Sequence, residues 1–137
     1  MARDVGDATR RTVIERAGRR CEYCLVHEDV GGFPHQIDHI ISRKHGGSSR
    51  PGNLAYACVL CNRHKGSDVA AIDRSGQTVR LFDPRRDSWR EHFKIDGPTI
   101  QPLTSIAEVT ARVLRLNAAE RVVERRLLQD IGLYPRK

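Results

Sequence analysis

The sequence has few aromatic residues and no long hydrophobic run. Phenylalanine, tryptophan and tyrosine make up 5% of its 137 residues, so we expect a modest, aliphatic core that a structural metal could reinforce. No segment approaches the roughly 20 consecutive apolar residues of a transmembrane helix, and residues 1–20 lack the apolar stretch of a signal peptide. The length of 137 residues predicts a single domain. The absent apolar segments predict no membrane partner and an intracellular, cytoplasmic location.

Acidic residues are outnumbered by basic ones. The chain has 17 Asp and Glu against 24 Lys and Arg, which gives a formal net charge of +7. A basic surface attracts polyanions such as nucleic acid. Charge alone fits a merely soluble surface equally well, so the function has to be argued from specific residues.

Cysteine is limited to four residues, which form two Cys-x-x-Cys pairs with none left over. The pairs are Cys21/Cys24 and Cys58/Cys61. A reducing compartment disfavours disulfides, and two such pairs are typical of a tetrahedral structural Zn²⁺ site. Thirty-three residues separate Cys24 from Cys58. This insertion is longer than a simple zinc ribbon needs, and it carries a polar motif.

The polar motif consists of Asp38-His39 and Asn53 within the insertion, with Asn62 directly after the last cysteine. Phosphodiester hydrolysis requires a group that deprotonates water, and histidine titrates near neutral pH. It also requires neutralisation of charge on the phosphate, which a hard divalent cation bound by carboxylate and carbonyl oxygens provides. Each residue alone has an ordinary structural interpretation, such as a turn for Asn53. Their joint order and spacing favour a nuclease site.

In combination these motifs resemble the HNH endonucleases that carry a zinc-knuckle pair. The matching residues are Cys21-x-x-Cys24, Asp38-His39-Ile40, Gly46-Gly47, Asn53-Leu54 and Cys58-x-x-Cys61-Asn62-x-x-Lys65-Gly66. The resemblance implies an α+β fold with a ββα-metal, treble-clef-like core. We expect one domain over residues 1–137, with an N-terminal helix, the core at 18–72, and a C-terminal extension at 73–137 that packs a hairpin and two helices on the core.

The resemblance also implies a role for each polar residue. Asp38 and Asn62 would hold a catalytic divalent cation, Mg²⁺ or Mn²⁺, and His39 would be the general base. Asn53 would hold the histidine-bearing loop in shape without touching the metal. The four cysteines would bind structural Zn²⁺, and His64 is an alternative to Asn62 as a ligand.

Several other polar residues near the motif have weaker interpretations. His35 would share a strand face with His39, and a core or supporting role suits it better than catalysis. Four basic residues are candidate phosphate contacts, although solvated charges would look the same in sequence: Arg43, Lys44, Arg63 and Lys65.

Local patterns predict most of the secondary structure. Helices are expected over residues 7–17, 59–65 and 117–130, and from Thr104 or Ser105 to Leu116; strands are expected over residues 33–41, 54–57 and 78–82. Ser105-x-x-Glu108 and Asn117-x-x-Glu120 fit capping boxes. Residues 89–95 are ambiguous between helix and strand.

Three functions compete on this basis. The first is a metal-dependent DNA endonuclease that acts on double-stranded DNA with weak sequence specificity, as a monomer or a dimer. The second is a non-catalytic, zinc-stabilised nucleic-acid-binding module, which would not need Asp38, His39 and Asn62 together. The third is a zinc-stabilised structural or protein-interaction domain, which the net charge of +7 does not support.

Overall fold

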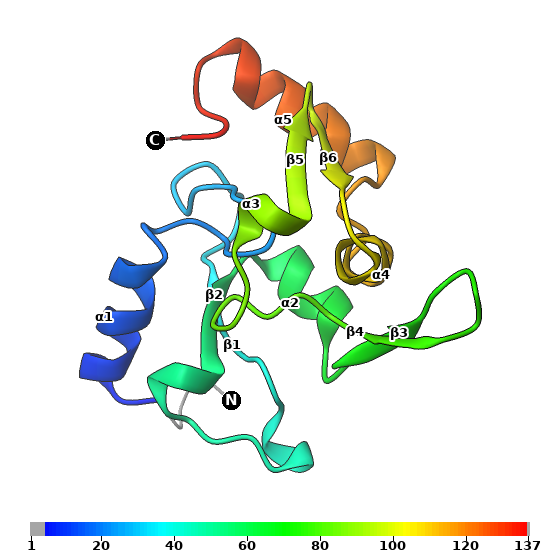
Figure 1. The fold of residues 1–137 in the computed structure, drawn as a ribbon. Coiled ribbons are helices and arrows are strands. Elements are labelled where there is room, and N and C mark those ends of the chain that lie inside the picture. The colour runs from blue at the N-terminus through cyan, green and yellow to red at the C-terminus, as the bar shows by residue number, and fades with distance from the viewer. Residues whose placement is uncertain (1–4, 137) are drawn as a thin grey trace.

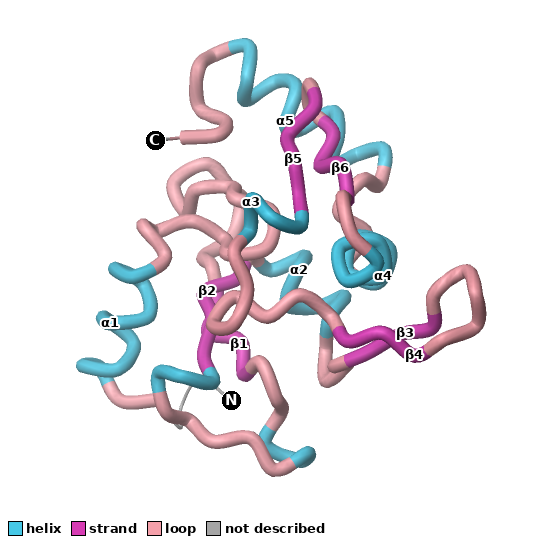
Figure 2. The backbone as a smooth tube through the Cα atoms, viewed as in Figure 1, coloured by secondary structure: helices cyan, strands magenta, loops and turns pink. Residues whose placement is uncertain are grey.

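The centre of the fold is a ββα unit between the two cysteine pairs. The computed structural model describes residues 5–136 (Figures 1 and 2). Strand β1 (Gln36–His39) pairs antiparallel with β2 (Leu54–Ala57), and helix α2 (Val59–Lys65) follows directly. The predicted bounds of β2 and α2 are confirmed, whereas β1 is shorter than the predicted 33–41. Short 3₁₀ helices, Arg43–His45 and Pro51–Asn53, shape the loop between the strands.

Helix α1 (Asp7–Arg16) packs against this strand pair and confirms the predicted N-terminal helix. Val13 is fully buried in a small cluster with Ile37 and Leu54 of the two strands. The Arg16 guanidinium donates to the Leu54 carbonyl at 2.7 Å, which fixes the helix along β2. In Figure 1, α1 and α2 lie on opposite sides of the strand pair.

The C-terminal extension contains more strands than the sequence indicated. Strand β3 (Ala70–Ile72) lies at the end of the range expected for the core. The extension itself comprises β4 (Thr78–Arg80), α3 (Trp89–His92), β5 (Phe93–Asp96), β6 (Thr99–Pro102), α4 (Ser105–Val113) and α5 (Ala119–Asp130). The β3–β4 and β5–β6 strands form separate antiparallel pairs, visible in Figure 2, and of these only β5–β6 lies wholly within residues 73–137. Strands of three or four residues are too short to display an alternating pattern in sequence.

Both predicted capping boxes were wrong. Thr104 caps α4, and its hydroxyl accepts from the Ala107 backbone N–H at 3.1 Å. Helix α5 begins after Ala118. The Asn117 side chain instead binds the backbone of Ile100 in β6, accepting from its N–H at 2.9 Å and donating to its carbonyl at 2.8 Å. Asn117 therefore joins the second hairpin to the start of α5.

The extension packs against the first cysteine pair. The largest buried cluster combines Tyr23 from this pair with Phe82, Phe93 and Leu116 from the extension. Backbone carbonyls near the pair accept side-chain hydrogen bonds from two distant aromatic residues: Trp89 Nε1 to Tyr23 at 2.9 Å, and the Tyr134 hydroxyl to Cys24 at 2.8 Å. Within residues 5–136, no helix has the length and apolar character needed to cross a bilayer.

Candidate metal centre and active-site cleft

The four cysteines converge on one point, as their pairing predicted. Their sulfurs all lie within 4.8 Å of one another, and Cys24 Sγ is 3.7 Å from Cys58 Sγ. A tetrahedral Zn²⁺ with Zn–S bonds of about 2.3 Å places its sulfurs about 3.8 Å apart. Backbone N–H groups also point at the sulfurs, including that of Cys61, 3.4 Å from Cys58 Sγ. The zinc-knuckle cluster (Cys21, Cys24, Cys58 and Cys61) therefore fits a structural Zn²⁺.

An arginine from the extension lies against this cluster. Arg121 of α5 is buried, and its Nη2 lies 3.1 Å from Cys61 Sγ and 3.8 Å from Cys58 Sγ. Four thiolates around one Zn²⁺ carry a net charge of −2, which a buried guanidinium partly offsets. Sequence reasoning missed Arg121, since nothing in a helical run of charged residues marks the one that faces inward.

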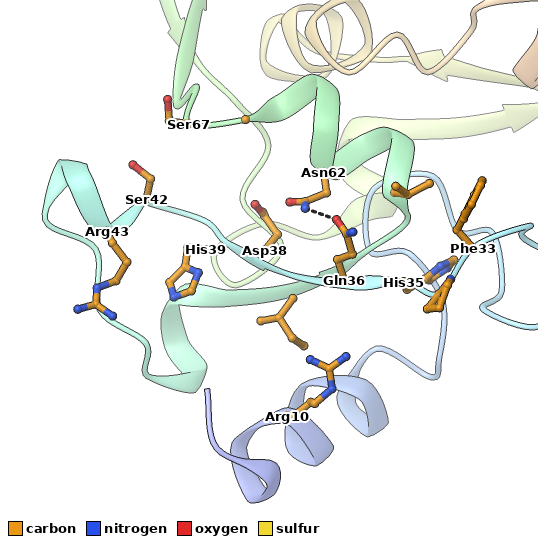
Figure 3. Close-up of a pocket in the computed structure, with 14 residues that line it drawn as sticks. Arg10, Phe33, His35, Gln36, Asp38, His39, Ser42, Arg43, Asn62 and Ser67 are labelled. Carbon is orange, nitrogen blue, oxygen red and sulfur yellow. Dashed lines mark hydrogen bonds between the residues drawn. The ribbon is translucent and has the colours of Figure 1, made fainter. Parts of the chain in front are cut away.

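A second, open site runs along β1. This cleft has a volume of about 680 Å³, and Asp38, His39 and Asn62 all line it. Figure 3 shows β1 crossing the cleft, with Asn62 of α2 above the strand and Arg10 of α1 below it. Asp38 and His39 of β1 are thus brought together with Asn62 of α2, whereas Asn53, the fourth predicted site residue, does not line the cleft.

Asp38 is buried at the cleft floor and has two donors. Its Oδ2 accepts from the Tyr23 hydroxyl at 2.8 Å, and its Oδ1 lies 3.3 Å from Lys65 Nζ. Burial raises the pKa of Asp38, while the Lys65 charge and the Tyr23 hydrogen bond act in the opposite direction. Tyr23 lies between Cys21 and Cys24, so the zinc-knuckle cluster directly orients this carboxylate.

Lys65 does not present its charge to solvent. The residue is 2% exposed, and Nζ donates to Asp38 and to the carbonyls of His39 and Ile40 at 3.2 and 3.0 Å. The prediction that Lys65 contacts a DNA phosphate was therefore wrong, because its ammonium is already enclosed by β1 oxygens. Its position indicates that it fixes the end of β1 that carries Asp38 and His39.

Asn62 is oriented by a residue that the sequence did not reveal. Its Nδ2 donates to Gln36 Oε1 at 2.5 Å, and Figure 3 shows the amide oxygen turned toward Asp38. Gln36 stands two positions before Asp38, so both side chains leave the same face of β1. The two-residue spacing of Gln36 and Asp38 is the sequence signal that could have identified Gln36. His64, the alternative ligand, does not line the cleft.

His39 and Arg43 converge on a serine in the loop between the strands. Ser49 Oγ lies 3.0 Å from His39 Nε2, and Arg43 Nη1 donates to the same oxygen at 3.4 Å. The hydrogen bond orients the imidazole ring relative to the loop. Ser49 was not predicted from the sequence, because a serine in a Gly/Ser-rich loop has no distinguishing pattern.

Asn53 spans the same loop with its side chain. Oδ1 accepts from Ile41 N–H at 2.9 Å, and Nδ2 donates to the carbonyls of Ile41 and Ser48 at 2.9 and 2.7 Å. Gly47 lies against this network: a Cβ there would be 1.7 Å from the Ile41 carbonyl oxygen and 2.8 Å from Asn53 Nδ2. The hydrogen bonds agree with the loop-holding arrangement expected of Asn53; its effect on activity stays a prediction.

The remaining candidates occupy different surroundings. Arg43 lines the cleft, and Lys44 is exposed beside it on the 3₁₀ turn. Arg63 lies instead beside a smaller cavity of about 340 Å³ that Cys58 and Arg121 also line. His35 is buried and its Nε2 lies 2.8 Å from the Val26 carbonyl, as expected for a core residue.

Comparison with known proteins adds a family match over part of the chain. A model of the HNH endonuclease family matches residues 21–68, a segment that contains both cysteine pairs, β1, β2 and α2. Curated proteins and solved structures gave no significant match. An HNH domain implies a nuclease-type function related to DNA. Residues 21–68, less than half of the chain, therefore resemble an HNH endonuclease domain, and their ββα fold and zinc-knuckle-like cysteine site agree with that match.

Proposed function

We propose that this protein is a metal-dependent DNA endonuclease that hydrolyses phosphodiester bonds. The observation that carries the proposal is the cleft along β1, where Asp38, His39 and Asn62 lie together within the matched HNH segment. An acid and an amide that offer oxygen ligands stand beside a candidate base. A binding module without catalysis would need none of these three side chains in one cleft.

His39 takes the proton from the attacking water in this proposal. Ser49 orients its ring through Nε2, and Asn53 holds the loop that carries Ser49 in place. The water attacks the phosphorus atom in line with the leaving oxygen. As in the HNH family, the products would be a 5′-phosphate and a 3′-hydroxyl.

Asp38 and Asn62 suit a hard divalent cation such as Mg²⁺ or Mn²⁺, because both offer oxygen ligands. When bound, the cation would supply positive charge for the phosphate and the leaving oxygen. Tyr23 and Lys65 favour the ionised form of Asp38 despite its burial. Gln36 keeps the Asn62 amide nitrogen occupied, so that the amide oxygen is the atom presented to the cation.

Arg43 and Lys44 are the proposed backbone contacts on the loop side of the cleft. Contacts to phosphates carry no base information, so we expect double-stranded DNA to be bound with weak sequence specificity. Binding should weaken steeply with salt, since each phosphate contact releases counterions. We further propose that the chain acts as one domain, since the extension is buried against the first cysteine pair.

The test is cleavage of supercoiled plasmid by the zinc-loaded protein with and without Mg²⁺. Omitting Mg²⁺, rather than adding a strong chelator, leaves the zinc-knuckle cluster loaded. We expect Mg²⁺-dependent nicking, and His39→Ala should lower the rate by about 100- to 10,000-fold, the usual contribution of a positioned general base. The matched control is His45→Ala, since His45 is exposed and does not line the cleft.

Two outcomes would contradict the proposal. The first is cleavage by His39→Ala at the wild-type rate, which would mean that another group activates water. Alternatively, the wild-type protein could bind DNA without cutting it in Mg²⁺ or Mn²⁺. That second result would favour the zinc-stabilised nucleic-acid-binding module.

A further inference from the structure

Helix α1 precedes the matched HNH segment, yet it contributes a side chain to the cleft. Arg10 lines the cleft together with Asp38, His39 and Arg43. In Figure 3 its guanidinium reaches toward β1 from the side opposite Asn62. The cleft is therefore completed by an element that the family match does not include.

Arg10 differs from every comparable arginine in the described part of the chain. Seven arginines there are partly or fully buried, and six of them donate hydrogen bonds to protein oxygens: Arg20, Arg80, Arg85, Arg121, Arg125 and Arg136. The Arg10 guanidinium has no hydrogen bond or ion pair with any residue of 5–136. Because none of its nitrogens is buried, the guanidinium is open to the cleft, where a ligand can reach it.

The helix holds Arg10 in a fixed position. Val13, three residues later on the same face, is fully buried against Ile37 and Leu54. Arg16 anchors the next turn to the Leu54 carbonyl. Because both strands of the ββα unit contact α1, Arg10 is positioned relative to Asp38 and His39 before any ligand arrives.

We propose that Arg10 binds a phosphate of the DNA backbone next to the phosphodiester that is cleaved. Its planar guanidinium presents several donors in a geometry that matches phosphate oxygens. Arg43 lines the cleft from the loop and Arg10 from α1, so the two cations would contact the same strand on either side of His39. This inference rests on the proposed nuclease function and adds a DNA-binding role for α1.

A contact to a flanking phosphate exists before and during the reaction. It therefore stabilises the bound DNA and the transition state about equally. Loss of Arg10 should raise the DNA concentration needed for half-maximal rate and leave the rate at saturating DNA close to wild type. This pattern distinguishes Arg10 from His39, whose loss should lower the saturating rate.

The experiment compares Arg10→Ala with Arg11→Ala. Both substitutions remove one positive charge from adjacent positions of α1, but Arg11 is exposed and lies outside the cleft. Alanine favours helix at either site, and zinc content with circular dichroism checks folding. Affinity for a fluorescent DNA duplex is measured over a salt series in the His39→Ala background, which prevents cleavage. Single-turnover rates are measured without that background.

We expect Arg10→Ala to weaken binding about tenfold at low salt and to reduce the slope of log affinity against log salt by about one. Arg11→Ala should change both quantities much less, and Arg10→Lys should restore part of the affinity. Equal effects of Arg10→Ala and Arg11→Ala would overturn the proposal, as would a fall in saturating rate with unchanged affinity. The binding measurements do not depend on cleavage, so an inactive wild-type protein would refute the proposed function and still leave the Arg10 contact tested.

Discussion

The zinc-knuckle cluster and the cleft lie on the same ββα unit but are built in opposite ways. The cluster consists of four sulfurs within 4.8 Å of one another, three of them fully buried, with Arg121 covering one side. The cleft is open, and chemically different side chains from α1, β1, the loop between the strands and α2 line it. A closed set of identical ligands stabilises a fold. An open set with an acid, an amide and a histidine leaves room for substrate and water.

The two sites are connected through one side chain. Tyr23 lies between two cysteines of the cluster and donates to Asp38 at the floor of the cleft. Metal at the cluster should therefore affect the cleft by fixing the position of Tyr23. Changes in the cleft should affect the cluster less, because the four sulfurs are held together without Asp38, His39 or Asn62.

The largest effect should follow from breaking the cluster. Cys58→Ser removes one of four ligands, and structural Zn²⁺ in small motifs contributes on the order of 10 kcal/mol, comparable with the whole stability of a typical domain. We expect loss of zinc, loss of the cooperative unfolding transition and loss of cleavage together. Zinc content and thermal unfolding measure this. A zinc-free variant with native thermal stability would show that the cluster is not the foundation of the fold.

A large effect confined to the cleft should come from Gly47→Ala. The added methyl group would lie 1.7 Å from the Ile41 carbonyl oxygen, so the loop held by Asn53 must move. We expect at least about a 100-fold loss of cleavage, the magnitude at stake when a general base is displaced. Zinc content should be retained, since the loop does not touch the cluster.

Gly52→Ala is the matched control for that loop. Gly52 lies in the same loop, and nothing lies within 4 Å of where its Cβ would be. Its variant should cleave at close to the wild-type rate. If Gly47→Ala and Gly52→Ala cleave at the same rate, the conformation of the loop does not affect catalysis by His39. The hydrogen bonds of Asn53 would then not be needed for activity.

Sequence reasoning succeeded where chemistry and local pattern coincide. The Cys-x-x-Cys pairs predicted a convergent cluster, and the bounds of β2 and α2 followed from the second pair and its helix. It failed where a residue's role depends on distant packing. In sequence Lys65 has the pattern of a surface cation, but its ammonium is buried against β1. Arg121 has the pattern of a solvated helix residue, but it contacts Cys61.

The extension shows the same division. Its two main helices were predicted from sequence, whereas the β5–β6 pairing was not, because each strand is only a few residues long. Thr104 rather than Ser105 caps α4, because Thr104 is the last extended residue before the helix and its hydroxyl accepts the hydrogen bond from the Ala107 N–H. Gln36 and Ser49 act through neighbours that only the fold brings close.

The smallest effect, and the sharpest test of the link between the two sites, comes from Tyr23→Phe. The variant keeps the buried ring and the zinc ligands but loses the hydroxyl that donates to Asp38. Burial already raises the pKa of Asp38, and the Tyr23 hydrogen bond lowers it, so removing the hydroxyl raises that pKa further. Only the ionised carboxylate holds a cation well. The cleavage rate and the Mn²⁺ affinity, the latter measured by calorimetry, should therefore begin to fall at a higher pH than in the wild type. Both should change little well above the Asp38 pKa.

Tyr56→Phe is the matched control, because it also removes a tyrosine–carboxylate hydrogen bond, to Glu28 at 2.6 Å, away from the cleft. It should leave the pH profile in place. An unshifted acidic limb in Tyr23→Phe, with zinc content intact, would mean that the cluster supports the fold without setting the state of Asp38.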